Sequence, residues 1–179
     1  MATIVIETGE VVAGANSFVS ESEYVEYFEE IGVSTNGDNL NRLPEQLVAA
    51  FRVMNRLYSG RLQGLKVSGE QTGLFPRQGM IDLETGLAID SGTIPQAVKY
   101  WQVEATYILL TQGSEVLEPV LPQVGGVKSF SSKVDVIEES VTFADVGYPA
   151  VSVFTKLDSL IRPFLKTFLS TDMPIVVKR

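Results

Sequence analysis

A polar loop at residues 74–93 constrains the fold most, because it contains a single large aromatic side chain and leads directly into an amphipathic segment. Pro76 disfavours helical backbone at Phe75, so Phe75 is held in an extended or turn conformation. Arg77 and Gly79 continue the turn. Since the neighbouring residues are too polar to bury themselves, we expect Phe75 to be the aromatic plug that fixes this loop to an apolar core.

A helix is predicted to follow this loop, from about residue 95 to residue 112. Thr93 can cap it, Gln96 can reach back to the cap, and Pro95 falls near the first turn, where its missing N–H costs nothing. The apolar spacing predicts which side chains point inward: Val98, Trp101, Ala105, Ile108 and Leu109.

Three further helices are indicated by apolar residues that recur at helical spacing. The first should begin after Ser20, which can form a capping box with Glu23, and should end at Gly32. The second should run from about Pro44 to Gly60, and the fourth from about residue 151 to residue 168 with a break at Pro163. The expected inward residues of the first helix are Tyr24, Tyr27, Phe28 and Ile31. Those of the second are Leu47, Val48, Phe51, Met54, Leu57 and Tyr58, and those of the fourth are Phe154, Leu157, Leu160, Ile161, Phe164 and Leu165.

The β-structure is expected to be minor. Residues 3–7 favour a short strand, residues 60–93 are expected to be mostly loop, and the valine-rich alternation at 127–143 favours a hairpin or an extended arm. The predicted fold class is therefore mainly α: a four-helix domain with a small β-hairpin or extended arm and a C-terminal tail. We expect one domain over residues 1–179, with a helical core at about 15–118 and 150–170, an arm at about 120–143 and a tail at 171–179.

The chain of 179 residues has no cysteine and no histidine, which removes disulfides, thiolate metal sites and the commonest general base near neutral pH. No G-x-S-x-G motif is present. Asp82, Glu84 and Asp90 faintly resemble a Ca²⁺ loop, but the spacing of the glycine is wrong, so they are better read as solvated turn carboxylates. We expect no enzymatic activity, no cofactor and no bound metal.

The net charge is −8, from 14 basic and 22 acidic residues. Proteins that hold nucleic acid by its phosphates normally carry a basic patch, whereas the cations here are scattered along the sequence. The N-terminus has no basic region ahead of its apolar residues, and no run of about 18 apolar residues occurs, so a cytoplasmic protein without a membrane partner is the default expectation.

Three phrases in order resemble a family of tailed-phage head–tail connector (adaptor or neck) proteins, some of which carry the label DnaT-like single-stranded-DNA-binding protein. The first phrase is ANSFVS at 15–20, followed by an acidic helix with Tyr27 and Phe28. The second is LFPRQG at 74–79, followed by IPQAV at 94–98, and the third is LIRPFL at 160–165. The matches span most of the chain. One departure is Phe75 where the family pattern has tryptophan, which keeps an aromatic anchor but loses the indole N–H.

This resemblance implies a virion structural protein of a bacteriophage. About twelve copies would form a homo-oligomeric ring between the portal protein and the next neck or tail protein, with DNA passing through the lumen during packaging and ejection without tight binding. Assembly in the host cytoplasm and final location in the virion neck would follow. The residues that carry the structural motif are Asn16, Phe75, Pro76, Arg77, Pro95 and Trp101. The residues expected to contact a neighbouring subunit or partner lie on the arm and tail: Val127, Phe130, Val134, Val136, Val141, Ile175, Val176 and Val177.

The alternative function is that of a single-stranded-DNA-binding module. Such a module needs a basic groove lined with aromatic side chains, and Phe75, Tyr100, Trp101 and Tyr107 are the available candidates for stacking on bases. Trp101 and Tyr107 fall largely on core spacing. Arg77 can contact a phosphate or a carboxylate, or it can anchor its own loop by a hydrogen bond to a helix C-terminus. Asn16 is read as a turn or cap residue.

Overall fold

The computed structural model describes residues 2–35, 40–113, 117 and 151–166, with the backbone alone at 151–154. Its helices are α1 (Glu21–Glu30), α2 (Leu43–Tyr58), α3 (Gln96–Gln112) and α4 (Val151–Ile161), with short 3-10 turns η1 (Leu40–Arg42) and η3 (Arg162–Phe164). Its strands are β1 (Leu65–Lys66), β2 (Arg77–Gln78), β3 (Met80–Ile81) and β4 (Ala88–Ile89). The described residues therefore confirm a mainly α fold.

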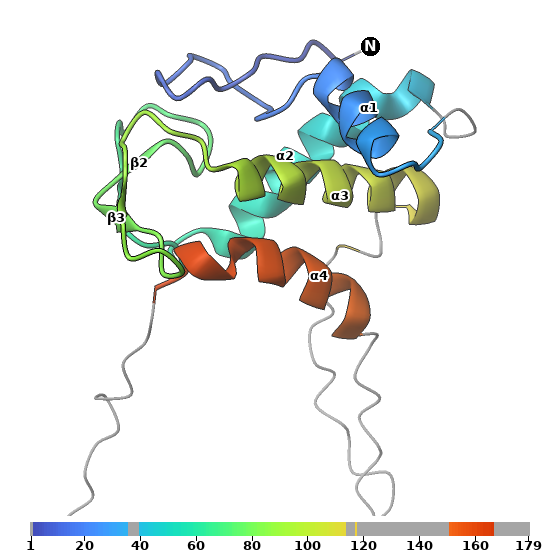
Figure 1. Ribbon diagram of the computed structural model, residues 1–179. Helices are drawn as coiled ribbons and strands as arrows, with labels where there is room; N and C mark the ends of the chain where they lie inside the picture. The colour runs from blue at the N-terminus through green and yellow to red at the C-terminus, as the bar shows by residue number, and fades with distance from the viewer. Residues whose placement is uncertain (1, 36–39, 114–116, 118–150, 167–179) are drawn as a thin grey trace, which may run out of the picture.

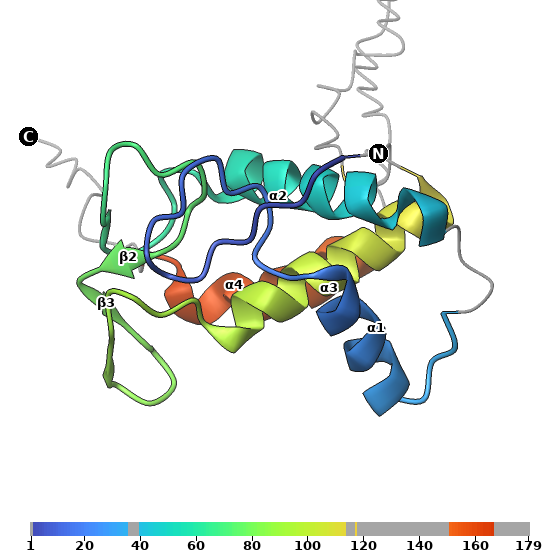
Figure 2. The same ribbon diagram turned by 90° about the horizontal axis from the view of Figure 1, so that it is seen from above.

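Helix α3 is the centre of the arrangement. Figure 2 shows α2 on one side of α3 and α1 on the other, and Figure 1 shows α4 running below α3. The nine buried residues of α3 include polar ones as well as all five predicted inward side chains. A helix that is covered on several sides is buried around most of its circumference, so α3 aligns the other three helices.

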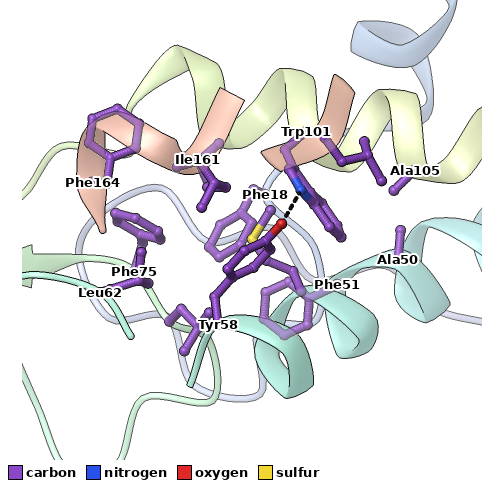
Figure 3. Close-up of a cluster of buried hydrophobic side chains, with 14 of the residues drawn as sticks. Phe18, Ala50, Phe51, Tyr58, Leu62, Phe75, Trp101, Ala105, Ile161 and Phe164 are labelled. Atoms are coloured by element: carbon purple, nitrogen blue, oxygen red, sulfur yellow. Dashed lines mark hydrogen bonds between the residues drawn. The ribbon is translucent and has the colours of Figure 1, made fainter. Parts of the chain in front are cut away.

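Aromatic side chains from five segments meet in the main core (Figure 3). Phe75 is fully buried, and its ring packs edge-on against Phe18, at 6.2 Å between centroids, and against Phe164, at 6.4 Å. Trp101 packs edge-on against Tyr58, and its indole Nε1 donates a 3.2 Å hydrogen bond to the Tyr58 hydroxyl. The loop before β2, the N-terminal segment, α2, α3 and η3 are thus joined in one aromatic cluster. The predicted burial of Phe75 in the core is confirmed.

Gln102, in the middle of α3, is the polar centre of the core. Its Oε1 accepts a 2.8 Å hydrogen bond from the backbone N–H of Phe18, and its Nε2 donates 2.9 Å hydrogen bonds to the Ser17 hydroxyl and to the carbonyl of Leu47. Because Gln102 is fully buried, each of these groups would otherwise lack water as a partner. One side chain therefore holds the N-terminal segment and α2 in register with α3.

Two predictions about helix ends have different outcomes. The capping box of α1 is confirmed, since the Glu23 N–H donates to the Ser20 hydroxyl at 3.1 Å and the Ser20 N–H donates to the Glu23 carboxylate at 2.7 Å. The cap predicted for α3 is wrong. That helix begins at Gln96 with Pro95 as its N-cap and no side-chain capping hydrogen bond. The ring of Pro95 holds φ at −57°, a value that suits the start of a helix, so the chain enters α3 here without a side-chain cap.

Several side chains and strands also differ from expectation. Ile31 is 55% exposed rather than inward, because α1 ends at Glu30 and the chain turns away at Gly32. Residues 3–7 form only a bridge between Ile6 and Ser17. Two short antiparallel pairs, β1–β2 and β3–β4, lie in the region expected to be mostly loop. The predicted hairpin or arm at 127–143 lies outside the described residues.

The fourth helix begins at the predicted residue 151 but ends at Ile161, where the chain continues as the 3-10 turn η3 through Pro163. The predicted break at this proline is confirmed, while the predicted helical end at residue 168 lies beyond the described residues. Leu157, Ile161 and Phe164 are buried, as their spacing predicted.

Replacing Phe75 with alanine should destabilise the fold by about 3–5 kcal/mol, because it removes a fully buried ring and leaves a cavity between two aromatic neighbours. Chemical denaturation followed by circular dichroism measures the change in the free energy of unfolding. Leu65→Ala is the control, since Leu65 is 70% exposed and should change that free energy by less than about 0.5 kcal/mol. A loss below about 1 kcal/mol at Phe75 would contradict the role of the plug.

Replacing Gln102 with leucine should cost about 1–3 kcal/mol, because the Phe18 N–H and the Leu47 carbonyl would remain buried without that partner. The matched control is Gln96→Leu at the exposed start of the same helix. Equal unfolding free energies for the two variants would show that the Gln102 hydrogen bonds make no net contribution.

Candidate interaction surfaces

Arg77 is a structural residue. It is 9% exposed, and its guanidinium donates to three carbonyls: Nε to Gln63 at 2.7 Å, Nη2 to Gly64 at 2.8 Å and Nη1 to Leu74 at 3.2 Å. Burial lowers the pKa of Arg77. The loop-anchoring alternative is therefore confirmed, although the carbonyls belong to loops and not to a helix C-terminus. With three of its donor nitrogens engaged, Arg77 has no free face for a phosphate.

The other motif residues are also parts of the scaffold. Asn16 accepts from the Val5 N–H at 2.8 Å and donates to the Thr3 carbonyl at 2.9 Å, which ties the N-terminal segment to itself. Pro76 follows the buried Phe75, Pro95 sets the start of α3, and Trp101 is fully buried. The structure thus brings Phe75 and Trp101 into one core and keeps Asn16 and Pro95 apart from it.

The predicted interface residues cannot be placed in this fold. Those of the arm (Val127, Phe130, Val134, Val136 and Val141) and those of the tail (Ile175, Val176 and Val177) all lie outside the described residues. Their role as interface residues stays a prediction.

A polar pocket lies between α1 and α3, with a volume of about 230 Å³. We call it the acidic pocket, and it is lined by Val19, Glu23, Glu26, Tyr27, Glu30, Gln96, Lys99, Tyr100 and Val103. The rings of Tyr27 and Tyr100 stand 5.0 Å apart at an angle of 47°. The sequence pattern predicted Tyr27 to be a core residue, and did not single out this pairing, because the two tyrosines are far apart along the chain.

Two interactions fix the walls of the acidic pocket. Lys99 Nζ contacts Glu23 Oε1 at 2.8 Å, and the Tyr27 hydroxyl donates to Glu104 Oε1 at 2.7 Å. Glu104, in turn, lies 2.7 Å from Lys156 Nζ. Partial burial and the neighbouring Glu104 carboxylate raise the pKa of Tyr27, so its hydroxyl stays protonated and keeps donating. Because Lys99 is paired with Glu23, the charge that remains in the pocket is that of Glu26 and Glu30, and it is negative.

Helix α1 carries its negative charge at both ends. Glu21 and Glu23 in the first turn interact favourably with the positive end of the helix dipole. Glu29 and Glu30 lie at the negative C-terminal end, where no basic residue compensates their charge. Within the part of the chain that the structure describes, Glu26, Glu29 and Glu30 form no ion pair. This end of α1 is therefore electrostatically suited to receive a cation.

Exposed basic residues lie on α2, in the loop after it, on η3 and just after η3, and we call this set the basic edge. Its members are Arg52, Arg56, Arg61, Arg162 and Lys166. Arg52 and Arg56 are one helical turn apart on the outer face of α2. The loop after α2 is joined to the segment after η3, since the Lys166 N–H donates to the Arg61 carbonyl at 2.8 Å and Lys166 Nζ donates to the Gly60 carbonyl at 2.9 Å.

The basic edge and the exposed aromatic rings do not share a surface. The end of α2 and η3 lie at the opposite end of the fold from α1 in both ribbon views (Figures 1 and 2). Tyr58, the aromatic residue beneath Arg61, is buried, and its hydroxyl donates to Asp158 at 2.6 Å. Tyr27 and Tyr100 are partly exposed, but they line the acidic pocket. In the acidic pocket these rings stand beside one cation, Lys99, which is paired with Glu23, so among the described residues the cations of the basic edge have no exposed aromatic face beside them.

The carboxylates of the candidate Ca²⁺ loop cap local turns. Asp82 accepts the Glu84 N–H at 2.9 Å, and Asp90 accepts the Gly92 N–H at 3.1 Å. Within the described ranges, no three acidic residues lie together in a way that suits a metal ion. None of the helices in the described ranges has the length and apolarity needed to cross a bilayer.

One family model matches residues 2–178, and its description is "Putative DnaT-like ssDNA binding protein". The chain belongs to this family. The match confirms the DnaT-like part of the resemblance drawn from the three sequence phrases, whereas the connector part stays a prediction. No curated protein and no solved structure matches the chain.

Replacing Glu23 with glutamine should weaken the fold slightly at neutral pH and make no difference in acid. Partial burial alone would raise the pKa of Glu23, but the hydrogen bonds from Lys99 and Ser20 outweigh it and lower that pKa below its ordinary value of 4.5. The stabilisation is therefore present above pH 4.5 and is lost as the pH falls through the lower folded-state value. Because glutamine still completes a capping box, we expect a loss of less than about 1 kcal/mol.

Urea denaturation of parent and variant at several pH values measures this effect. The difference between the two unfolding free energies should shrink as the pH falls below 4.5. Glu70→Gln, in an exposed loop, is the matched control and should show no such trend. A difference that is constant over the whole pH range would contradict the assigned interactions.

Proposed function

We propose that this protein is a structural assembly subunit of a tailed bacteriophage, a head–tail adaptor that forms a ring between the portal and the neck or tail. The observation that carries this proposal is the segregation of charge on one rigid helical core. The acidic pocket is lined by residues of α1 and α3, whereas the basic edge is carried by α2, the loop after it and η3 with the segment after it; Figure 2 shows α1 and α2 on opposite sides of α3. The resemblance of the three sequence phrases to connector proteins supplies the place in the virion.

Charge segregation favours a ring because it gives each chain two different, complementary surfaces. Contacts between unlike surfaces are heterologous, and they close into a ring when the rotation between neighbours divides a full turn. An acidic chain also suits a channel through which DNA slides, since negative walls do not retain phosphates. In this proposal, the portal and the next neck protein contact other surfaces of the ring.

Binding of single-stranded DNA is the second candidate function, and it is favoured by the description of the family. The basic edge is the surface that would carry it, because its five cations are exposed. Without an adjacent exposed aromatic face, bases cannot stack there, so binding would depend on phosphate contacts alone. We expect such binding to be weak and independent of sequence.

Immunogold labelling of tailed particles, produced from the genome that carries this gene, tests the adaptor proposal. The label should lie at the junction between head and tail, and mass spectrometry of purified particles should detect the chain in several copies per virion. Absence of the chain from purified particles would overturn the proposal. Labelling of the tail tip or of the whole capsid surface would also be inconsistent with it.

Fluorescence anisotropy with a single-stranded oligonucleotide tests the second candidate. We expect a Kd weaker than about 10⁻⁶ M at physiological salt, in the range of non-specific contacts. Tight binding that weakens steeply with salt, and that is lost in Arg52→Glu/Arg56→Glu but kept in the control Glu70→Arg, would make DNA binding the function. The two experiments use different readouts, so either function can fail on its own.

A further inference from the structure

We propose that the acidic pocket of one copy binds the Arg52 and Arg56 face of a second copy, so that chains join head to tail. This inference rests on the proposed function, because it names the contact by which the ring would close. It commits to a second copy of the chain because the two surfaces are opposite in charge and are carried by α1 and α2, which lie on opposite sides of α3 (Figure 2).

The acidic pocket has the chemistry that an arginine side chain requires. Three carboxylates, those of Glu23, Glu26 and Glu30, face one ammonium, that of Lys99, which is already paired with Glu23. The paired rings of Tyr27 and Tyr100 offer faces on which a planar guanidinium can stack. Arginine suits such a site better than lysine, because it stacks and also hydrogen-bonds a carboxylate in a bidentate manner.

The C-terminal end of α1 adds a second attraction. Helix carbonyls without internal partners make this end negative, and Glu29 and Glu30 increase that charge instead of offsetting it. Negative side chains at this end are unfavourable for an isolated helix, so a cation from a second copy would relieve this repulsion. Ile31, which is 55% exposed at the same end, provides an apolar contact at the rim.

The basic face of α2 is complementary. Arg52 and Arg56 are exposed, lie one turn apart, and form no ion pair with another described residue. Two like charges at this spacing repel each other, so an acidic partner stabilises the helix that carries them. The i,i+4 spacing also presents two guanidinium groups side by side, which matches the two unpaired carboxylates of Glu26 and Glu30.

Single exposed ion pairs are weak and are screened by salt, so this contact should form cooperatively and should weaken as ionic strength rises. A protein of this kind is expected to be mostly monomeric at low concentration and to assemble when neighbours are held together. The test must therefore trap a weak contact.

The absence of cysteine allows the contact to be trapped without a background thiol. The double variant Glu30→Cys/Arg56→Cys is oxidised at low salt and run on a non-reducing gel. A head-to-tail contact predicts a ladder of dimers, trimers and larger species, because each chain carries both reactive positions. Each single variant should give dimers at most. The matched control Glu70→Cys/Arg56→Cys has an exposed cysteine away from the pocket and should give no such ladder.

A charge exchange in the Glu30→Cys/Arg56→Cys background then tests whether the remaining charges direct the contact. Adding Arg52→Glu should abolish the ladder, and adding Glu26→Arg to that protein should restore it. Any one of three results would overturn the inference. The ladder could be missing, it could be equally strong in the control, or the exchanged charges could fail to restore it. The assay contains no virion, so a ladder without labelling at the neck would sink the adaptor proposal and leave this contact standing. Labelling at the neck without a ladder would support the adaptor proposal and overturn the proposed contact.

Discussion

The hydrogen bonds of Gln102 are the interaction on which the arrangement of helices depends. This side chain joins the backbone N–H of Phe18, the Ser17 hydroxyl and the Leu47 carbonyl from within the middle of α3. Apolar packing around Trp101 and Phe75 supplies much of the buried area but is tolerant of small shifts, whereas a buried amide has only one arrangement that satisfies all its partners. The N-terminal segment and α2 are therefore placed by polar geometry, and the aromatic cluster fills the space that this geometry leaves.

The parts of the fold that follow from local chemistry could be predicted from the sequence. The capping box at Ser20 and Glu23 and the inward stripes of α2 and α3 depend on residues three or four positions apart. The Gln102 interactions and the pairing of Tyr27 with Tyr100 could not be predicted, since they join residues about 55 to 85 positions apart and leave no periodic signal. The sequence left Arg77 open between a phosphate or carboxylate contact and a loop anchor, because the three carbonyls that decide between them are placed by the folding of two loops.

The candidate surfaces show the same division. The acidic run of α1 is visible in the sequence, but its basic counterpart is not, because Arg61 lies beside Lys166 only when the loop after α2 pairs with the segment after η3. The net charge of −8 gives no sign of the basic edge, which the described part of the chain nevertheless carries. For association between copies, the distribution of charge matters more than its sum.

The position of Gln102 within α3 has a mechanical consequence for any closed assembly. In a ring of identical subunits, the angle between the two contact surfaces of one chain is repeated at every joint, so a small angular error in each copy accumulates around the circumference. Helix α3 lies between α2, which bears the basic edge, and α1, which bears the acidic pocket (Figure 2). The buried amide ties α2 to α3, and the bonds from Tyr27 to Glu104 and from Lys99 to Glu23 tie α1 to α3, so the closure of the circle depends on how firmly both helices are held against α3.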